Sequence, residues 1–331
     1  MKTTTFDQPP VTRNPDGSLR SVGFELEFAG PPIEDVVDVV RRELGGDVER
    51  LNLYRYEVET GELGTFKIEL DWALLSDPEQ RRRVRELVDS ETALELVDWV
   101  EEVVAELAQT VVPIEVVSPP IPLDRLDEME RLRSALRELG ARGTGDSLVY
   151  AFGMHLNPEA PSFEPSSIQA HLQAFLLLQD WLEQRHEVDL TRRLTPYVNP
   201  FPKAYVQRAV GARGEPTLDE LIDGYLEDNA TRNRPLDLLP LFAHLDEERV
   251  RGRLDDPLVG SRPAYHYRLP GCRVDQEDWS LAREWNLWLT VERLAADPPR
   301  LEEMCSAYLE QAESPLRFLG TPWVERVAEW L

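Results

Sequence analysis

Gly23-Phe24-Glu25-Leu26-Glu27-Phe28 is the segment that most strongly indicates how this chain folds. Side chains alternate between the two faces of a β-strand, so Glu25 and Glu27 project together while the apolar residues between them point into a core. The same alternation recurs in four later stretches, at residues 66–71, 114–116, 154–157 and 265–268. If these strands belong to one sheet, they form a wall of carboxylate, imidazole, ammonium and guanidinium groups. Such a wall has the chemistry that a metal–phosphate site needs.

Length and composition indicate a globular protein. The chain has 331 residues, of which 42% are hydrophobic, enough for one large domain or two smaller ones. The N-terminal stretch MKTTTFDQPP contains no apolar run, and no stretch of 18 apolar residues follows, so we expect neither a signal peptide nor a membrane span. Cys272 and Cys305 are too few for a disulfide framework and match no zinc spacing. The expected location is therefore the cytoplasm.

The chain is strongly acidic. It has 62 acidic against 36 basic residues, which gives a formal net charge of −26. Such a field repels nucleic acid and anionic lipid, and we expect neither as a partner. A solvated acidic surface accounts for most of this charge. Among only three lysines, Lys67 lies within one of the charged strands, which favours a specific role for it.

The order of the elements predicts an α+β fold with a curved, mainly antiparallel sheet, packed helices and a helical C-terminal part. Residues 1–18 are polar and are predicted to be flexible, and residues 19–331 are predicted to form a single domain whose helical part begins at about 270. Neither GxGxxG nor GxxxxGK[ST] occurs, so no Rossmann or P-loop site is expected. Strands are predicted over 19–28, 47–59, 65–71, 111–117, 148–156 and 264–269, and helices over 33–44, 78–109, 123–139, 166–185, within 190–262 and over much of 270–331.

Glu25 and Glu27 are the first candidate metal ligands. Two residues along a strand span about 6.5–7 Å, so these carboxylates can converge on one ion or bracket a pair of ions. Oxygen ligands suit Mg²⁺ or Mn²⁺. The alternative is the solvated outer face of an antiparallel sheet. Gly23 favours the site, because a position without a side chain lets a ligand or a backbone approach closely.

The next two charged strands add further candidates. Lys67, Glu69 and Asp71 share one face, where Lys67 would touch a phosphate and the acids would join the metal cluster. A cross-strand surface pair is the alternative. Glu115 stands among apolar neighbours in PIEVVSPP, where a carboxylate is costly to bury unless it is paired or bound to a metal.

The last two charged strands carry a histidine and an arginine. His155 in GMHLNP shares its face with Asn157, and is either a metal or phosphate ligand or a hydrogen-bonded structural residue. Arg268 follows His266 on one face of YHYRLP, and its guanidinium suits two-point contact with phosphate. An arginine that bridges the sheet to a neighbouring acid is the alternative.

Taken in order, GFELEF, GTFKIELDWAL, PIEVVSPP, GMHLNP and YHYRLP resemble the amidoligase family over roughly residues 20–290. The resemblance implies a glutamine-synthetase-like fold and an ATP-dependent carboxylate–amine ligase that uses Mg²⁺ or Mn²⁺. It implies a catalytic role for three residues and a metal- or nucleotide-binding role for an overlapping set. The catalytic residues are Lys67, Asp71 and Arg268; the metal ligands are Glu25, Glu27, Glu115 and His155; and ATP contacts come from Lys67, His155 and Arg268.

Two positions depart from the pattern of that family. Where the family often has a second histidine, two residues after the first, this chain has Asn157. Where the late strand often has an acid two residues before the arginine, this chain has His266. Both changes remove a charged ligand, so the number and arrangement of metals differ from the family pattern or the activity is altered.

The expected reaction joins a small-molecule or peptide carboxylate to an amine through an acyl-phosphate. Glu69 and Asp71 are the candidates for the base that accepts the proton of the amine. Two other functions fit the same residues: a non-catalytic acidic interaction protein that keeps the fold, and a metal-dependent hydrolase that uses no ATP. The sequence leaves the substrates and the oligomeric state open.

Overall fold

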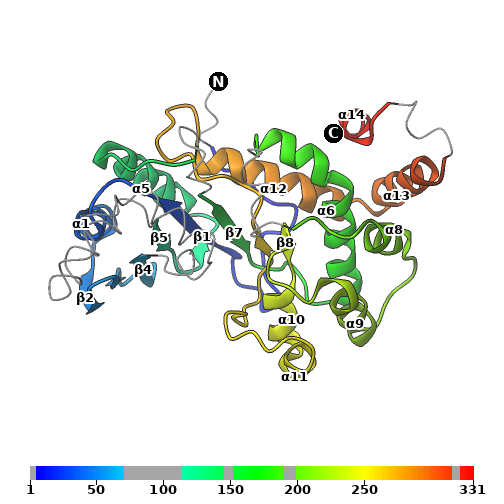
Figure 1. Ribbon diagram of the computed structural model, residues 1–331, viewed down its shortest axis with the longest axis horizontal. Helices are drawn as coiled ribbons and strands as arrows, with labels where there is room; N and C mark the ends of the chain where they lie inside the picture. Colours follow the sequence, from blue (N-terminus) through cyan, green and yellow to red (C-terminus); the bar gives the residue numbers. More distant parts are fainter. Residues whose placement is uncertain (1–4, 71–112, 145–151, 189–198, 315–320) are drawn as a thin grey trace, which may run out of the picture.

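The computed structural model describes residues 5–70, 113–144, 152–188, 199–314 and 321–331 (Figure 1). Within these ranges it is an α+β structure with one open antiparallel sheet, and the C-terminal part is helical. The predicted fold class is therefore confirmed. The predicted helices over 78–109 lie outside the described residues.

The sheet contains nine strands in the described chain, and the first strand is central. β1 pairs with β5 on one side and β7 on the other, both antiparallel, and the short β6 pairs with the start of β1. The order across the sheet is β2-β3-β4-β5-β1-β7-β9-β8. The strands are β1 (Ser21–Phe28), β2 (Asp47–Asn52), β3 (Arg55–Glu59), β4 (Thr65–Leu70), β5 (Ile114–Val117), β6 (Ile121–Pro122), β7 (Met154–Pro158), β8 (Leu236–Asp237) and β9 (His266–Tyr267).

The predicted single strand over 47–59 is wrong in one respect, because it is two strands. Asp47–Asn52 and Arg55–Glu59 form an antiparallel hairpin around a turn at Leu53 and Tyr54. The register shifts between Arg50 and Asn52, and the side-chain amide of Asn52 accepts a hydrogen bond from the Tyr54 N–H at 2.8 Å. Asparagine forms such local turns readily, and it ends the strand here. A three-stranded meander, β2-β3-β4, results.

Helices cover the apolar face of the sheet and surround its right-hand end in Figure 1. Phe24, Leu26 and Phe28 on β1 are fully buried beneath them. At the other end, Tyr267 of β9 contacts Phe175 and Trp288, with ring centroids 6.0 and 5.1 Å apart. The described helices are α1 (Ile33–Leu44), α5 (Leu126–Leu139), α6 (Pro165–Arg185), α8 (Lys203–Gly211), α9 (Leu218–Asn229), α10 (Leu239–Leu245), α11 (Glu247–Arg251), α12 (Leu281–Ala295), α13 (Pro298–Glu313) and α14 (Trp323–Val327).

The N-terminal segment packs against α12, beside the start of β1. Nε1 of Trp285 on α12 donates to the carbonyl of Asp7 at 2.9 Å, and Phe6 is buried. A buried ion pair joins Arg20, just before β1, to Glu292 of α12 through two hydrogen bonds of 2.7 and 2.8 Å. The division into a flexible segment 1–18 and one domain 19–331 stays a prediction. No helix in the described ranges combines the length and apolar character that crossing a membrane would require.

Candidate active site

The strand register places the charged residues on one face of the sheet, which we call the polar face. Glu25 on β1 lies directly opposite His155 on β7, and Glu27 lies opposite Glu115 on β5. Glu115 in turn lies opposite Glu69 on β4. Residues directly opposite each other in antiparallel strands project from the same face. The five side chains therefore belong to one surface, opposite the apolar face that the helices cover.

Glu25 is the most buried of the four glutamates on this surface, with 8% of the residue exposed. Its Oε2 accepts from Nδ1 of His155 at 2.8 Å, and its Oε1 accepts from Nδ2 of Asn157 at 2.8 Å and Nη1 of Arg262 at 3.0 Å. Burial alone would raise the pKa of Glu25. The hydrogen bond from His155 and the charge of Arg262 nevertheless hold the pKa of this carboxyl well below its usual range. Glu25 is therefore ionised, and its three hydrogen-bonding partners hold its carboxylate in place.

A hydrogen-bonded relay leads from Glu25 across the next two strands. The side-chain oxygen of Asn157 accepts from Nδ1 of His266 at 2.7 Å, while Nη1 of Arg268 lies 3.1 Å from Nε2 of His266. A guanidinium can only donate, so Nε2 of His266 is unprotonated and the imidazole is neutral. Burial holds the pKa of His266 well below its usual value, although the charge of Glu25 acts in the opposite direction.

Gly23 makes room for this relay. It is the register partner of Asn157, and a Cβ at position 23 would lie 3.3 Å from the Cβ of Asn157 and 3.4 Å from its Nδ2. Contacts this short require the neighbour to shift. The absence of a side chain at Gly23 therefore lets Asn157 sit close to β1 and reach Glu25.

A row of carboxylates occupies the other half of the polar face. Glu27, Glu115 and Glu69 follow one another across β1, β5 and β4. Side chains directly opposite lie about 4.5–5.5 Å apart at Cβ, and like charges at that distance repel unless they are neutralised. Glu69 has Arg55 at 3.4 Å, and Oε2 of Glu27 accepts from the Gly153 N–H at 2.6 Å. Carboxylate oxygens at such adjoining positions are suitable ligands for a divalent cation.

Two residues of the polar face escaped prediction from the sequence. Arg262 lies in a loop with no strand pattern, so nothing local indicates that its guanidinium contacts Glu25. Asp237 belongs to the two-residue strand β8, where it lies opposite His266 and is 2% exposed. Burial raises the pKa of Asp237 to about 7, although the Leu239 N–H and Arg268 favour the charged form. The sequence signal for β8 was too short to read.

A comparison with known protein families matches this part of the chain. A family model described as "Putative amidoligase enzyme" covers residues 18–290, which include every strand of the described sheet. The chain belongs to this amidoligase family. No curated protein and no solved structure matches it at a significant level. The predicted likeness to glutamine synthetase, including the curvature of the sheet, therefore stays a prediction.

The polar face of this amidoligase holds the predicted site residues that lie in the described ranges. Glu25, Glu27, Glu115 and His155 belong to adjoining positions of β1, β5 and β7. Lys67 is exposed on β4, opposite Val117, which in turn lies opposite Glu25. Two strand spacings, about 10 Å, therefore separate the backbones of Lys67 and Glu25. Arg268 reaches the same face through His266, and Asp71 lies outside the described residues.

The donor groups of the amidoligase divide into two chemically different ends. At one end, Glu25, His155 and His266 offer one carboxylate oxygen and two imidazole nitrogens, all within 4.8 Å of one another. At the other end, Glu27 and Glu115 offer oxygen alone. Nε2 of His155 lies 3.9 Å from Oε1 of Glu27, which joins the two ends. Both ends have donor sets that fit a divalent cation.

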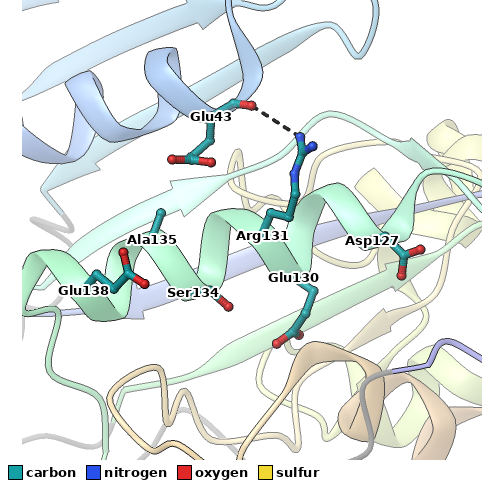
Figure 2. Close-up of a pocket in the computed structure, with 7 residues that line it drawn as sticks. All are labelled: Glu43, Asp127, Glu130, Arg131, Ser134, Ala135 and Glu138. Atoms are coloured by element: carbon teal, nitrogen blue, oxygen red, sulfur yellow. Dashed lines mark hydrogen bonds between the residues drawn. The ribbon is translucent and has the colours of Figure 1, made fainter.

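A separate hollow lies between α1 and α5, away from the polar face (Figure 2). Its volume is about 410 Å³. Four carboxylates and one guanidinium line it, and Nη2 of Arg131 donates to the Glu43 carbonyl across its mouth at 3.4 Å. Its net negative lining is unsuited to an anionic ligand such as ATP. The polar face is therefore the better candidate for the active site.

Proposed function

We propose that this amidoligase joins a carboxylate to an amine and uses ATP to activate the carboxylate as an acyl-phosphate. One observation carries the proposal: a single sheet face combines carboxylates that suit a divalent cation with guanidinium groups that suit phosphate. This face lies within the span that matches the family. The carboxylates are Glu27 and Glu115, and the guanidinium groups are those of Arg262 and Arg268.

The divalent cation of the proposed reaction is Mg²⁺ or Mn²⁺. Glu25, Glu27, Glu115 and His155 form the predicted ligand set, and their adjoining register positions support it. Mg²⁺ usually takes one or two carboxylates together with substrate phosphates, and Glu27 with Glu115 offers that number. When bound, the ion neutralises charge on the phosphates of ATP.

The positive side chains would contact the phosphates. Arg268 and Arg262 are both partly exposed, so each can turn part of its guanidinium towards a ligand while it keeps its contact with His266 or Glu25. Lys67 is exposed two strands away, where its long side chain can reach the far end of a nucleotide. These groups would stabilise the negative charge that spreads over the transferred phosphoryl group.

The proposed chemistry has two steps. An oxygen of the substrate carboxylate attacks the γ-phosphorus of ATP, and ADP leaves. The nitrogen of the amine then attacks the acyl carbon, phosphate leaves, and the amine passes a proton to a base. Of the two predicted bases, Glu69 lies 3.4 Å from Arg55 in an ion pair, and Asp71 lies outside the described residues.

The proposed substrates are small molecules or peptides that supply a carboxylate and an amine. The net charge of −26 disfavours nucleic acid and anionic membranes as partners. Local guanidinium groups are therefore what would draw an anionic nucleotide to the polar face.

The test uses the full chain, ATP and Mg²⁺, with pools of amino acids and dicarboxylic acids as the carboxylate and with hydroxylamine as the amine. Hydroxylamine captures an acyl-phosphate as a hydroxamate, which ferric ion reveals by colour. We expect hydroxamate and ADP to form in equal amounts, and only when ATP, Mg²⁺ and a suitable acid are all present.

Other outcomes would identify the alternative functions. Hydrolysis of ester or amide substrates without nucleotide would contradict the proposal and favour a metal-dependent hydrolase. Failure to bind ATP at millimolar concentration with Mg²⁺, measured by calorimetry, would also contradict it and favour a non-catalytic protein. ADP release that depends on neither the acid nor the amine would contradict ligase activity and indicate an ATPase.

A further inference from the structure

A second hollow lies between α6, α8 and α9, at the end of the molecule opposite the β2–β3 hairpin (Figure 1). Its volume is about 540 Å³, which is within the range of small-molecule sites in proteins. The residues that line it come from these three helices and from the loop between α8 and α9, and none of them belongs to the sheet. The hollow is therefore separate from the polar face.

Two buried side chains present polar atoms to this hollow. Gln173 is 6% exposed, and its Nε2 donates to the carbonyls of Ala209 and Ala212 at 2.9 and 3.0 Å. Both amide hydrogens are thereby used, which leaves Oε1 as an acceptor. Tyr205 is 3% exposed, and within the described residues neither its Oη nor Oε1 of Gln173 has a hydrogen-bond partner. Buried polar atoms are normally hydrogen-bonded, so these two are available to a ligand.

The charged side chains around the hollow balance one another. Two exposed guanidinium groups and two exposed carboxylates line it, those of Arg208, Arg213, Glu215 and Glu220. The lining is therefore neutral overall, in a chain whose formal net charge is −26. Nη1 of Arg213 donates to two backbone carbonyls at 2.8 and 3.1 Å, and its guanidinium has further N–H donors for a ligand. A neutral lining that contains both signs suits a ligand that carries both charges.

The wall of the hollow adds an apolar surface. Leu172, Leu221 and Tyr225 line it, and each is less than 10% exposed. This surface suits an apolar side chain of a ligand, since burial of apolar area favours binding. A groove filled only by water is the competing explanation, because water can also satisfy unpaired polar atoms. The two explanations differ in whether one ligand needs both its charges in order to bind.

We propose that this hollow binds a zwitterionic amino compound with an apolar side chain, either a free amino acid or a dipeptide. The carboxylate of the ligand would contact the guanidinium of Arg213. Its ammonium would donate to Oε1 of Gln173 and Oη of Tyr205, and its side chain would lie against Leu172 and Leu221. The proposal goes beyond the proposed function and does not depend on it, because the hollow shares no residue with the polar face.

The experiment measures binding to the full chain by calorimetry in the absence of ATP. The probes are leucine, phenylalanine and the dipeptide alanyl-leucine. We expect at least one probe to bind at one site per chain with a Kd below about 1 mM. The amide of that probe lacks the carboxylate, and its deaminated acid lacks the ammonium. Each should bind at least about 10-fold more weakly, because each loses a charge-assisted hydrogen bond.

Substitutions assign the binding to the hollow. Tyr205→Phe removes an Oη that has no partner within the described residues, so it should keep the stability of the unaltered protein and weaken probe binding about 2–10-fold. Arg213→Met should weaken it about 10–100-fold, because a charged donor is lost. Tyr308→Phe, on α13 with its ring against Trp323, is the matched control and should bind the probe as the unaltered protein does.

Four results would overturn the proposal. They are the failure of every probe to bind, equal binding of the probe and its amide, full affinity in folded Tyr205→Phe or Arg213→Met, and a loss in Arg268→Met as large as that in Arg213→Met. The last result would place the probe on the polar face. Binding that Arg268→Met leaves intact would support the site even if no hydroxamate forms. Hydroxamate formation without such binding would support the proposed function alone.

Discussion

At the scale of single residues, the polar face depends on side chains that each form hydrogen bonds with two neighbouring residues. Asn157 donates to Glu25 and accepts from His266, so one amide links β1 to β9 through β7. An aspartate at this position could not donate to Glu25, and a leucine could do neither. The chemistry of the face is therefore sensitive to single atoms, and two residue-scale features can be tested separately.

Arg268→Met tests the proposed phosphate contact. The substitution keeps much of the aliphatic stem but removes the guanidinium, and loss of one such charge-stabilising donor typically lowers turnover by about 10²–10³-fold. Hydroxamate formation measures the effect. Arg41→Met, on the exposed surface of α1 beside Asp38, is the control and should leave turnover unchanged. Full activity in Arg268→Met would remove this arginine from the proposed mechanism.

Asp237→Asn tests the effect of a buried carboxyl on stability. The pKa of Asp237 is about 7 in the folded protein, against an ordinary value of 3.8, because the carboxyl is buried. The folded state therefore holds the proton more tightly than the unfolded state does. Asp237 thus favours folding most at low pH, and this contribution falls as the pH rises from about 4 to about 7, by at most about 1.4 kcal/mol per pH unit.

The expected result is a difference between the two proteins that grows with pH. Asparagine cannot ionise, so the free energy of unfolding of Asp237→Asn should increase relative to the unaltered protein between pH 4 and pH 7 and then level off. Urea denaturation at each pH measures it. Asp38→Asn, exposed on α1, should not reproduce the trend. A difference independent of pH would show that Asp237 is ionised throughout.

At the scale of elements, the connection between α1 and the β2–β3 hairpin depends on a close approach between two backbone segments, at Gly46 and Glu59. Gly46 has a φ of +100°, and a Cβ there would lie 2.2 Å from the Glu59 carbonyl oxygen. Gly45 also has a positive φ, of +77°, but its Cβ would meet nothing within 4 Å. A side chain at Gly45 would therefore introduce backbone strain alone, whereas one at Gly46 would add steric overlap with Glu59.

Gly46→Ala should therefore destabilise the protein more than Gly45→Ala. Each substitution forces alanine into a conformation that costs on the order of 1–3 kcal/mol. At Gly46 the Glu59 backbone must also move, which disturbs the pairing of β2 with β3. Urea denaturation measures both free energies of unfolding. Equal losses would show that the hairpin adjusts without cost.

The same scale shows which elements can be read from sequence. The strand of Glu25 and Glu27, and the helix over 33–44, follow from strict alternation and from apolar residues three and four apart. The turn inside 47–59 was missed because Leu51 and Leu53 keep a two-residue apolar spacing into it, and because no glycine or proline marks it. β8 was missed because two residues carry no period at all.

At the scale of the whole molecule, the Arg20–Glu292 pair ties the start of β1 to α12. Both side chains are at most 2% exposed, and Glu292 also accepts from Nε1 of Trp288 at 2.8 Å. Arg20→Met would leave the Glu292 charge buried without its partner, which typically costs about 3–5 kcal/mol. Thermal and urea unfolding should both register the loss.

The double variant Arg20→Met/Glu292→Leu provides the decisive comparison. Removing both charges eliminates the uncompensated carboxylate, so the double variant should be more stable than Arg20→Met alone. Arg41→Met, whose ion pair with Asp38 is exposed, should lose less than about 1 kcal/mol. If the double variant were less stable than both single variants, Arg20→Met and Arg41→Met, the hydrogen bonds between Arg20 and Glu292 would be worth more than the cost of removing the two charges from water.

Alternation in the amino-acid sequence is enough to assign Glu25, Glu27, Glu115, His155 and Arg268 to strands with one apolar and one polar side. Alternation is local, because a strand repeats every two residues. It does not say which strands are neighbours or in what register. The folded sheet is needed to see that Glu25 faces His155, that Asn157 bridges to His266, and that Arg262 and Asp237 reach the same face. Three of those four contacts join residues more than 100 positions apart, and the pairing of strands across the sheet brings all four together.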